Sequence, residues 1–444
     1  MRYQFFILTI LLFPALIKAQ NGDKIVSKMK SVNDSLVSKS CVSADAAAIS
    51  NRAMNIFLSD VTGYVSSKTD LSYFTNYVTY NTAESKLTVN HNFQKASGAD
   101  EPIKKLFSVG LSITIPNIYA ASFLDYRHET GLGFMLGYKW LGKVKTRFAD
   151  CAAGQNLVNQ KQKMDALRTG IVNSLAVEIK NKETDFEISQ NETRKTDFNG
   201  LQPDSATAII RQKFYAELNE KADEEFATLQ AVALTETKNF SLISTHWTGI
   251  HFYLPVFSSK YDVAPLVTED FQQKKSYPLE LILSHTRLWE SSKKGRFFAT
   301  FGTSILLNNS KLSYRLENVG YSEYKNMGGT DNQHDEALKS NKTYLGNYEN
   351  FITPSAQLRL IYFPVEYHLG LSILVQQNFG KYNFLNSRIG IPVVLINSKK
   401  TPAIDFEFYV SFTDITNQSG IANNPENKTF VGMSLGIPLS RLMY

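Results

Sequence analysis

The feature that most constrains the fold is an alternation of bulky and small side chains along stretches of about ten residues. In residues 107–115, bulky apolar side chains alternate with Ser, Gly and Thr, and residues 132–140 alternate in a similar way. Residues 404–412 and 431–439 repeat the pattern. Successive side chains of a β-strand point to opposite faces, so each stretch predicts a strand with one bulky apolar face and one small or polar face.

Strand length and the small face distinguish two β architectures. A soluble sandwich buries its apolar face and uses shorter strands, of roughly five or six residues. A transmembrane barrel turns bulky side chains toward lipid, fills its interior with small and polar ones, and needs about 9–11 residues per strand. The pattern favours a mainly β protein with a transmembrane antiparallel β-barrel, and soluble sandwich domains remain the alternative.

Twelve stretches fit such strands, an even number as single-chain bacterial barrels require. The first, second and fifth alternate less clearly than the others. Together they predict a barrel made of residues 71–146 and 240–444. The predicted strands lie near residues 71–80, 85–93, 107–116, 131–141, 245–255, 277–288, 296–307, 355–363, 367–377, 385–396, 403–413 and 428–439.

A charge-rich segment interrupts this pattern between the fourth and fifth strands. Residues 155–238 contain 11 Lys and Arg and 14 Asp and Glu, which is 25 of 84 residues, against 63 of the other 360. Apolar residues recur there at steps of three and four, the period of an amphipathic helix. We therefore expect a long helical hairpin as an insertion over residues 147–239. The predicted apolar face of the hairpin comprises Met164, Leu167, Ile171, Ile210, Phe214, Leu218 and Phe226.

The N-terminal part of the chain indicates export. Residues 1–19 combine an early positive charge, a central apolar run and a small residue at the end, as a secretory signal peptide does. A membrane anchor is the alternative, but the apolar run is short for one. Residues 20–70 predict a helical periplasmic leader, with one helix after residue 24 and a second from Ser43 to about Phe57.

The chain resembles the outer-membrane β-barrel proteins of Gram-negative bacteria over about residues 71–444. The resemblance rests on the alternating strands and on the ending VGMSLGIPLSRLMY, with its terminal aromatic Tyr444. The Ser and Gly alternation and the residue Gln20 after the predicted cleavage site are similar to proteins from the Bacteroidota. This resemblance implies outer-membrane lipid around the barrel and recognition of the last strand by the barrel-assembly machinery.

Connection lengths predict how such a barrel is oriented. With both termini in the periplasm, the short connections 289–295, 364–366 and 397–402 fall on the periplasmic side, as expected for outer-membrane barrels. The helical hairpin then also lies in the periplasm, and an error of one strand would place it outside the cell. We expect three tryptophans to form a membrane-interface girdle at the periplasmic rim: Trp140, Trp247 and Trp289.

Charged residues on the small faces of the strands are predicted to point into the lumen. They comprise three of each sign: Lys139, Glu280, Arg359, Arg388, Asp405 and Glu407. One interpretation is a polar constriction that selects solutes. The other is a network of ion pairs that fills the barrel, because buried charges need partners. The sequence leaves both open.

Other kinds of site have weak support. The seven histidines show no metal-ligand spacing, no GxSxG or phosphate-binding loop is present, and we expect no enzyme activity, metal or cofactor. The run from Asp331 to Glu336 is either a cation-binding loop or a solvated one. Cys41 and Cys151 are candidates for a disulfide in the oxidising periplasm. The net charge of +6 is mild for 444 residues, so nucleic acid is not an expected partner.

Three hypotheses of function follow. The first is an outer-membrane anchor whose periplasmic hairpin engages an envelope protein in an assembly, secretion or structural role. The second is a passive channel or solute transporter that uses the charged lumen. The third, which the absence of catalytic motifs disfavours, is an envelope enzyme.

Overall fold

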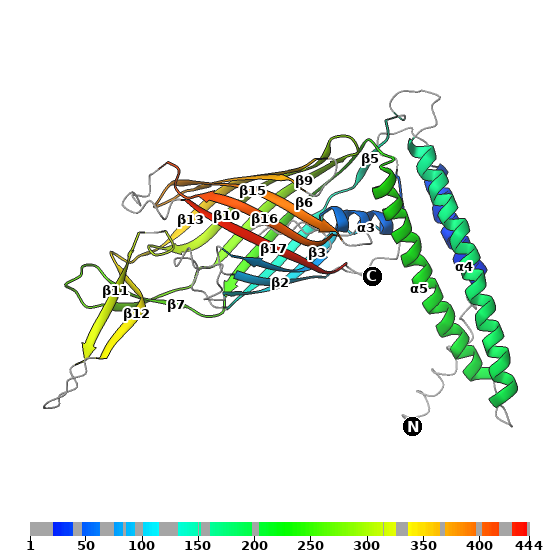
Figure 1. Ribbon diagram of the computed structural model, residues 1–444, viewed down its shortest axis with the longest axis horizontal. Coiled ribbons are helices and arrows are strands. Elements are labelled where there is room, and N and C mark those ends of the chain that lie inside the picture. Colours follow the sequence, from blue (N-terminus) through cyan, green and yellow to red (C-terminus); the bar gives the residue numbers. More distant parts are fainter. Residues whose placement is uncertain are drawn as a thin grey trace, which may run out of the picture. The chain divides into compact units, whose positions relative to one another are not determined.

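Twelve antiparallel strands form a closed barrel in the computed structural model (Figure 1). The structure describes residues 21–38, 47–62, 75–82, 86–93, 101–114, 132–149, 151, 160–197, 204–313, 315–325, 336–364, 369–396, 402–416 and 429–441. The barrel strands are β1 (Thr75–Asn81), β2 (Lys86–Phe93), β3 (Lys105–Thr114), β4 (Leu132–Leu141), β6 (Leu242–Pro255), β9 (Glu280–Ser291), β10 (Gly295–Asn309), β13 (Asn350–Phe363), β14 (Leu371–Asn378), β15 (Phe384–Ile396), β16 (Pro402–Phe412) and β17 (Thr429–Arg441).

Two pairings between strands distant in sequence close the barrel. β1 pairs with β17, where Val78 lies opposite Ile437. β4 pairs with β6 across the long insertion, where Leu136 lies opposite Phe252. The sequence prediction of a twelve-stranded antiparallel barrel is therefore confirmed, including the three stretches with weak alternation. A short strand, β5 (Lys145–Arg147), is an additional member of the same sheet.

The connections between strands divide between the two ends of the barrel. We call the end at which β1 begins and β17 ends the terminal end, and the opposite one the loop end. The chain turns within residues 292–294 at the terminal end, and it also leaves β4 for the long insertion there. The loop end has the long connections 256–279 and 310–349.

The loop-end connections contain a second sheet that the sequence reading did not predict. Its four strands follow the order β11-β12-β7-β8, and β12 pairs with β7 in parallel. The strands are β7 (Ser259–Ala264), β8 (Gln272–Ser276), β11 (Glu317–Lys325) and β12 (Glu336–Leu345). The sequence does not predict these strands, because they are short or polar and lack the ten-residue alternation of the barrel.

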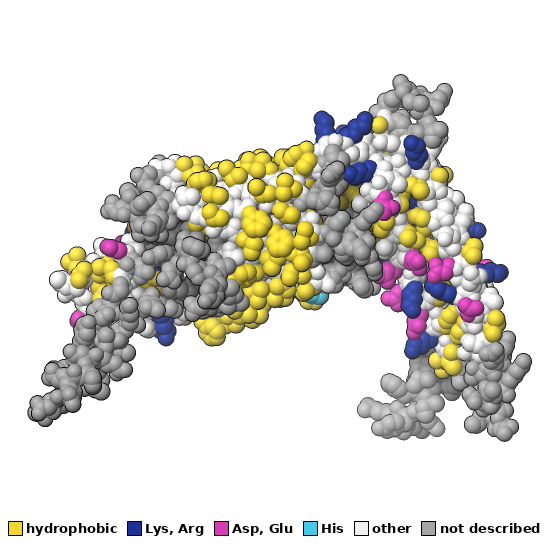
Figure 2. All heavy atoms as spheres, viewed as in Figure 1, with side chains coloured by type: hydrophobic (Ala, Val, Ile, Leu, Met, Phe, Trp, Pro, Cys, Tyr) yellow, Lys and Arg dark blue, Asp and Glu magenta, His cyan; other side chains and the backbone are white. Residues whose placement is uncertain are grey.

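The outer surface of the barrel is apolar. Figure 2 shows apolar side chains gathered over the barrel strands. They come from the outward positions of strands all around the barrel, and many are more than two-fifths exposed. Examples are Phe107, Phe134, Leu283, Phe301, Ile352, Leu358, Ile389, Phe408 and Val431.

Contacts between Cα atoms divide the chain into two units. One consists of residues 1–57 and 146–240, and the other of residues 58–145 and 241–444. The first unit contains the helices α2 (Gly22–Ser38), α4 (Gln160–Asp197) and α5 (Asp204–Thr237), and the second contains the barrel. The division falls within α3 (Asn51–Val61), so that its last turn belongs to the barrel unit.

The helical unit has its own apolar core, in which α2 packs with α4 and α5. The two long helices also meet through the stacked rings of Phe186 and Phe214, whose centroids are 3.9 Å apart. The hydroxyl of Tyr215 donates a hydrogen bond of 2.7 Å to Glu183, and burial together with this carboxylate raises the pKa of Tyr215. The buried core residues are Ile25, Met29, Val172, Leu175, Ile179, Tyr215, Leu218, Ala222 and Phe226.

A buried cation lies beside this core and explains an error in the predicted helix face. Arg168 on α4 is fully buried and donates hydrogen bonds to Asp165, to Asn33 of α2 and to the carbonyl of Ala48. The buried stripe of α4 therefore passes through a charged residue, which an apolar pattern does not count. Met164, Ile171, Phe214, Leu218 and Phe226 are buried or partly buried. The placement of Leu167 and Ile210 on the packed face is wrong, since both are exposed.

The helix α3 begins later than the sequence suggested. We expected a helix from Ser43 to about Phe57, and the described helix runs from Asn51 to Val61, with residues 39–46 outside the described part. Ser50 sets the start, because its hydroxyl accepts a hydrogen bond of 3.3 Å from the backbone N–H of Ala53.

Overpacking at Ala222 should show that this face of α5 is in the core. Ala222 is buried among residues of α2, α4 and α5, so we expect Ala222→Leu to lower the free energy of unfolding by about 1–3 kcal/mol. Ala216, on the exposed face of the same helix, is the matched control. Ala216→Leu should change the free energy of unfolding by less than about 0.5 kcal/mol. Urea unfolding followed by helical circular dichroism measures both. Equal effects would contradict the described packing.

Candidate functional site

Every second residue of each barrel strand points into the barrel. On β3, Ser108 and Ser112 are buried, whereas Phe107 and Ile113 are exposed. The small face seen in the sequence is therefore the inner surface, and the charged residues on that face share it. Five of the six charged residues predicted for the lumen are buried there: Lys139, Arg359, Arg388, Asp405 and Glu407. The sixth, Glu280, lines a cavity.

Glu407 is the centre of a buried polar cluster. Nη2 of Arg359 lies 3.2 Å from Oε2 and 3.4 Å from Oε1 of Glu407, and the two side chains are 3% and 1% exposed. The hydroxyl of Ser372 also donates a hydrogen bond to Oε1. These residues come from β13, β16 and β14, so the cluster joins strands across the interior. Removing Glu407 would take a carboxylate partner away from a buried guanidinium, which is costly.

A second contact links a cation to an aromatic ring. The guanidinium of Arg388 lies 4.0 Å from the ring centroid of Tyr409, whose hydroxyl donates a hydrogen bond of 2.8 Å to Asn81. The ring lies against Gly432 of the neighbouring strand, where a Cβ would come within 2.5 Å of it. The glycine thus makes room for the tyrosine and fixes its position.

Asp405 differs from the other buried charges. Its side chain is 1% exposed, and neither carboxylate oxygen has a hydrogen-bond partner among the described residues. A buried carboxylate without hydrogen bonds is costly when ionised. We therefore expect Asp405 to contribute less to stability than Glu407, although the two residues are on the same face of β16.

Bulky side chains are buried on one wall of the interior in the terminal half. They belong to β6, β9, β10 and β13, and none is more than 1% exposed. They are Ile243, Trp247, Leu288, Phe298, Ile361 and Phe363.

The last turn of α3 adds to this end of the barrel. Leu58, Val61 and Thr62 are almost completely buried. The carbonyl of Val61 accepts a hydrogen bond of 2.8 Å from Nη1 of Arg296, whose Nε donates to Glu290 at 2.8 Å. The sequence does not predict this ion pair, because residues 289–295 are expected to form a connection. The continued alternation at the end of β9 was the available signal.

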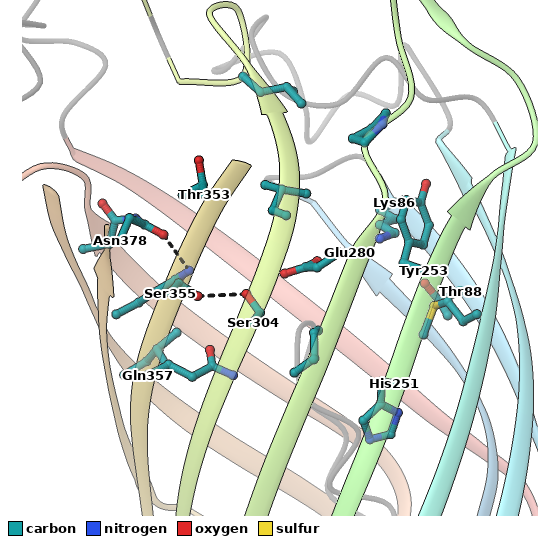
Figure 3. Close-up of a pocket in the computed structure, with 18 of the residues that line it drawn as sticks. Lys86, Thr88, His251, Tyr253, Glu280, Ser304, Thr353, Ser355, Gln357 and Asn378 are labelled. Atoms are coloured by element: carbon teal, nitrogen blue, oxygen red, sulfur yellow. Dashed lines mark hydrogen bonds between the residues drawn. The ribbon is translucent and has the colours of Figure 1, made fainter. Parts of the chain in front are cut away.

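The loop half contains a cavity of about 320 Å³. Figure 3 shows its wall, with Gln357, Ser304, Glu280 and His251 on four neighbouring strands. Hydroxyl and amide side chains are the most frequent residues in the lining, and the bulky residues of the terminal half do not contribute to it. The loop half of the interior thus contains a polar cavity, whereas bulky side chains are buried in the terminal half.

The three tryptophans lie near the terminal end, but they do not form one outward girdle. Trp140 is 42% exposed on the outer surface, and Trp289 packs there beside Phe297, with ring centroids 5.6 Å apart. Trp247 is buried and points inward, so its placement at a membrane interface is wrong. Its neighbours of the same parity, Thr245 and Gly249, are small, as inward residues of this barrel often are.

Two further features can be placed only in part. Cys151 is disulfide-bonded, and the chain's other cysteine, Cys41, lies outside the described residues. Most of the run from Asp331 to Glu336 is also outside them.

Among the described residues, no group of three or more His, Cys, Asp or Glu side chains could hold a metal ion. No described helix is both long and apolar enough to cross a membrane.

Comparison with known proteins does not assign the chain to a family. No family model matches the sequence, and a search of curated proteins finds no match.

Proposed function

We propose that the protein is an outer-membrane anchor: a barrel that spans the membrane without conducting and carries a helical unit that engages an envelope protein. The observation that carries this proposal is the contrast between an apolar outer surface and the bulky side chains buried inside the terminal half. Residues 1–19, which lie outside the described part, would act as the signal peptide.

The outer surface supports membrane insertion. Contiguous exposed apolar side chains on this scale are rare on soluble monomers. A closed barrel also has no unpaired strand edge, so the hydrogen-bonding groups of its strands are satisfied without water, as a bilayer requires. The apolar side chains in Figure 2 are thus where lipid chains would contact the protein.

The filled terminal half supports an anchor over a channel. A hydrated ion would have to pass the bulky aromatic and aliphatic residues at this end, together with the buried Arg359 and Glu407. A passive channel is the competing function, favoured by the open and polar loop half.

The helical unit supports a docking role. Val177, Ile188 and Ile209 on α4 and α5 lie outside its buried core and are more than half exposed. A partner that packs on these helices would remove these apolar side chains from water, which favours association. In the proposed orientation, this unit faces the periplasm. The barrel-assembly machinery would recognise the last strand of the barrel.

Photo-crosslinking in the native host tests the docking role. A photoreactive residue at Val177, which is 62% exposed, should give an adduct of one discrete mass. The same residue at Val267, which is 78% exposed on the loop-end segment, should give none of that mass. An absence of adducts at Val177, or the same adduct from both positions, would contradict docking through the helical unit.

A further inference from the structure

The cavity in the loop half is lined mainly by side chains that both donate and accept hydrogen bonds. Its volume of about 320 Å³ is at the lower end of the range for small-molecule pockets, about 300–1,000 Å³. The hydroxyl and amide groups come from strands around the whole barrel. They are Thr79, Thr88, Asn90, Ser108, Ser304, Asn308, Thr353, Ser355, Gln357, Gln376, Asn378, Asn386, Ser387, Ser411 and Thr413.

Glycines hold two of the polar side chains flat against the wall. A Cβ at Gly302 would come within 2.8 Å of the amide nitrogen of Gln357. At Gly137 and Gly249, a Cβ would lie 2.9 and 2.8 Å from ring nitrogens of His251. A larger residue at these positions would displace the side chains into the cavity. The wall is therefore shaped for these polar groups.

Some polar groups in the cavity are not used by the protein itself. Among the described residues, the amide of Gln357 and the carboxylate of Glu280 form no hydrogen bond to another side chain or to the backbone. Others are already arranged: the hydroxyls of Ser304 and Ser355 are 2.8 Å apart, and the amide of Gln376 donates to Asn378 at 3.2 Å (Figure 3). Donors and acceptors thus face the cavity in fixed positions.

Aromatic rings and three charged side chains, Lys86, Arg388 and Glu280, complete the lining. Tyr253, Phe384 and Phe430 contribute rings, and Nζ of Lys86 lies 4.7 Å from the ring centroid of Tyr253. Tyr253 is also directly opposite Glu280 in the strand pairing. A cation therefore lies over this ring, and the paired residue on the next strand is a carboxylate.

We propose that this cavity binds a neutral saccharide of one or two rings, admitted from the loop end. Hydroxyl groups of a sugar both donate and accept, which matches Ser, Thr, Asn and Gln side chains. The apolar face of a sugar ring packs on aromatic rings such as that of Tyr253. An ionic ligand fits less well, because Lys86 and Glu280 offset each other and the guanidinium of Arg388 already lies over the ring of Tyr409. The terminal half closes the opposite side, so the cavity binds the ligand rather than passing it through.

Titration calorimetry on the purified full-length protein in detergent tests the proposal. The probes are D-glucose, D-galactose, maltose and lactose, with D-gluconate as the charged comparison. At least one neutral sugar should bind saturably, and D-gluconate should bind at least tenfold more weakly. The variant Gln357→Leu should weaken sugar binding roughly tenfold, the loss expected for a hydrogen bond in a desolvated site.

The matched control is Gln377→Leu. Gln377 is one residue along β14 from the lining residue Gln376, does not line the cavity, and donates its hydrogen bond to the carbonyl of Asn378. This variant should bind sugar as the unmodified protein does. Circular dichroism confirms that both variants keep their strands, and Ser304→Ala is a smaller change at the same wall, expected to weaken binding about threefold. Binding of no neutral sugar, equal binding of D-gluconate, or unchanged affinity in both Gln357→Leu and Ser304→Ala would overturn the proposal. Conductance of the barrel would not overturn sugar binding. A failure of the anchor proposal can therefore be distinguished from a failure of this one.

Discussion

Replacing Glu407 with Ala should lower the free energy of unfolding by about 3–5 kcal/mol. The side chain is 1% exposed and lies 3.2 Å from Nη2 of Arg359. Its removal takes away the carboxylate that lies 3.2 Å from Nη2 of the buried Arg359, and it also removes the acceptor of Ser372. Guanidinium unfolding of the protein reconstituted in lipid vesicles measures the change.

Two further variants separate this cause from a simple loss of packing. Asp405→Ala removes a carboxylate from the same face of β16 that has no hydrogen-bond partner among the described residues, so its cost should be much smaller. The double variant Arg359→Met with Glu407→Leu removes both charges and keeps most of the volume. It should recover most of the lost stability, because a packed apolar pair often equals a buried ion pair. A double variant as unstable as Glu407→Ala would show that charge compensation is not the cause.

Replacing Phe301 with Lys should lower the free energy of unfolding in a bilayer by about 2–4 kcal/mol. Phe301 is 55% exposed on the outer surface of β10, where it lies between His285 of β9 and Leu358 of β13. If lipid surrounds this surface, the new ammonium group has no water within reach near the middle of the membrane. In a water-exposed strand the same substitution would change stability by less than about 0.5 kcal/mol.

Val267→Lys is the control for Phe301→Lys. Val267 is 78% exposed between β7 and β8, in the segment beyond the loop end. The substitution there should leave stability within about 0.5 kcal/mol. Both variants are compared by unfolding in vesicles of one lipid composition. Equal and small changes would show that the apolar surface of the barrel contacts water.

The barrel could be predicted from the sequence because each strand has its own alternation of side chains. On strands such as β3 and β16, each residue's face follows from parity alone, and the lumen or exterior then determines whether it is small, charged or bulky. The same rule predicts that Trp247 points inward, because it is two residues away from both Thr245 and Gly249, which face the lumen. A general preference of tryptophan for membrane interfaces was the weaker signal there, since the strand's own alternation decided the direction of the side chain.

The remaining features depend on contacts between distant residues. The face of α4 depends on α2, because Arg168 is buried only when Asn33 and the Ala48 carbonyl accept its hydrogen bonds. The sheet at the loop end pairs β12 with β7, some 80 residues apart, through short polar strands. The cavity and the filled half result from side chains of nearly all the strands together. No single stretch of sequence contains these arrangements.

Conductance of the purified full-length protein in a planar lipid bilayer tests the central claim most directly. The protein should insert, as shown by co-flotation with vesicles, and should give no discrete current steps above those of lipid alone. A variant with Trp247, Phe298 and Phe363 all replaced by Ala should give steps, because it removes three of the bulky side chains that fill the terminal half. Reproducible, ion-selective current steps from the unmodified protein would contradict the proposal of a non-conducting anchor and would indicate that the barrel is a channel.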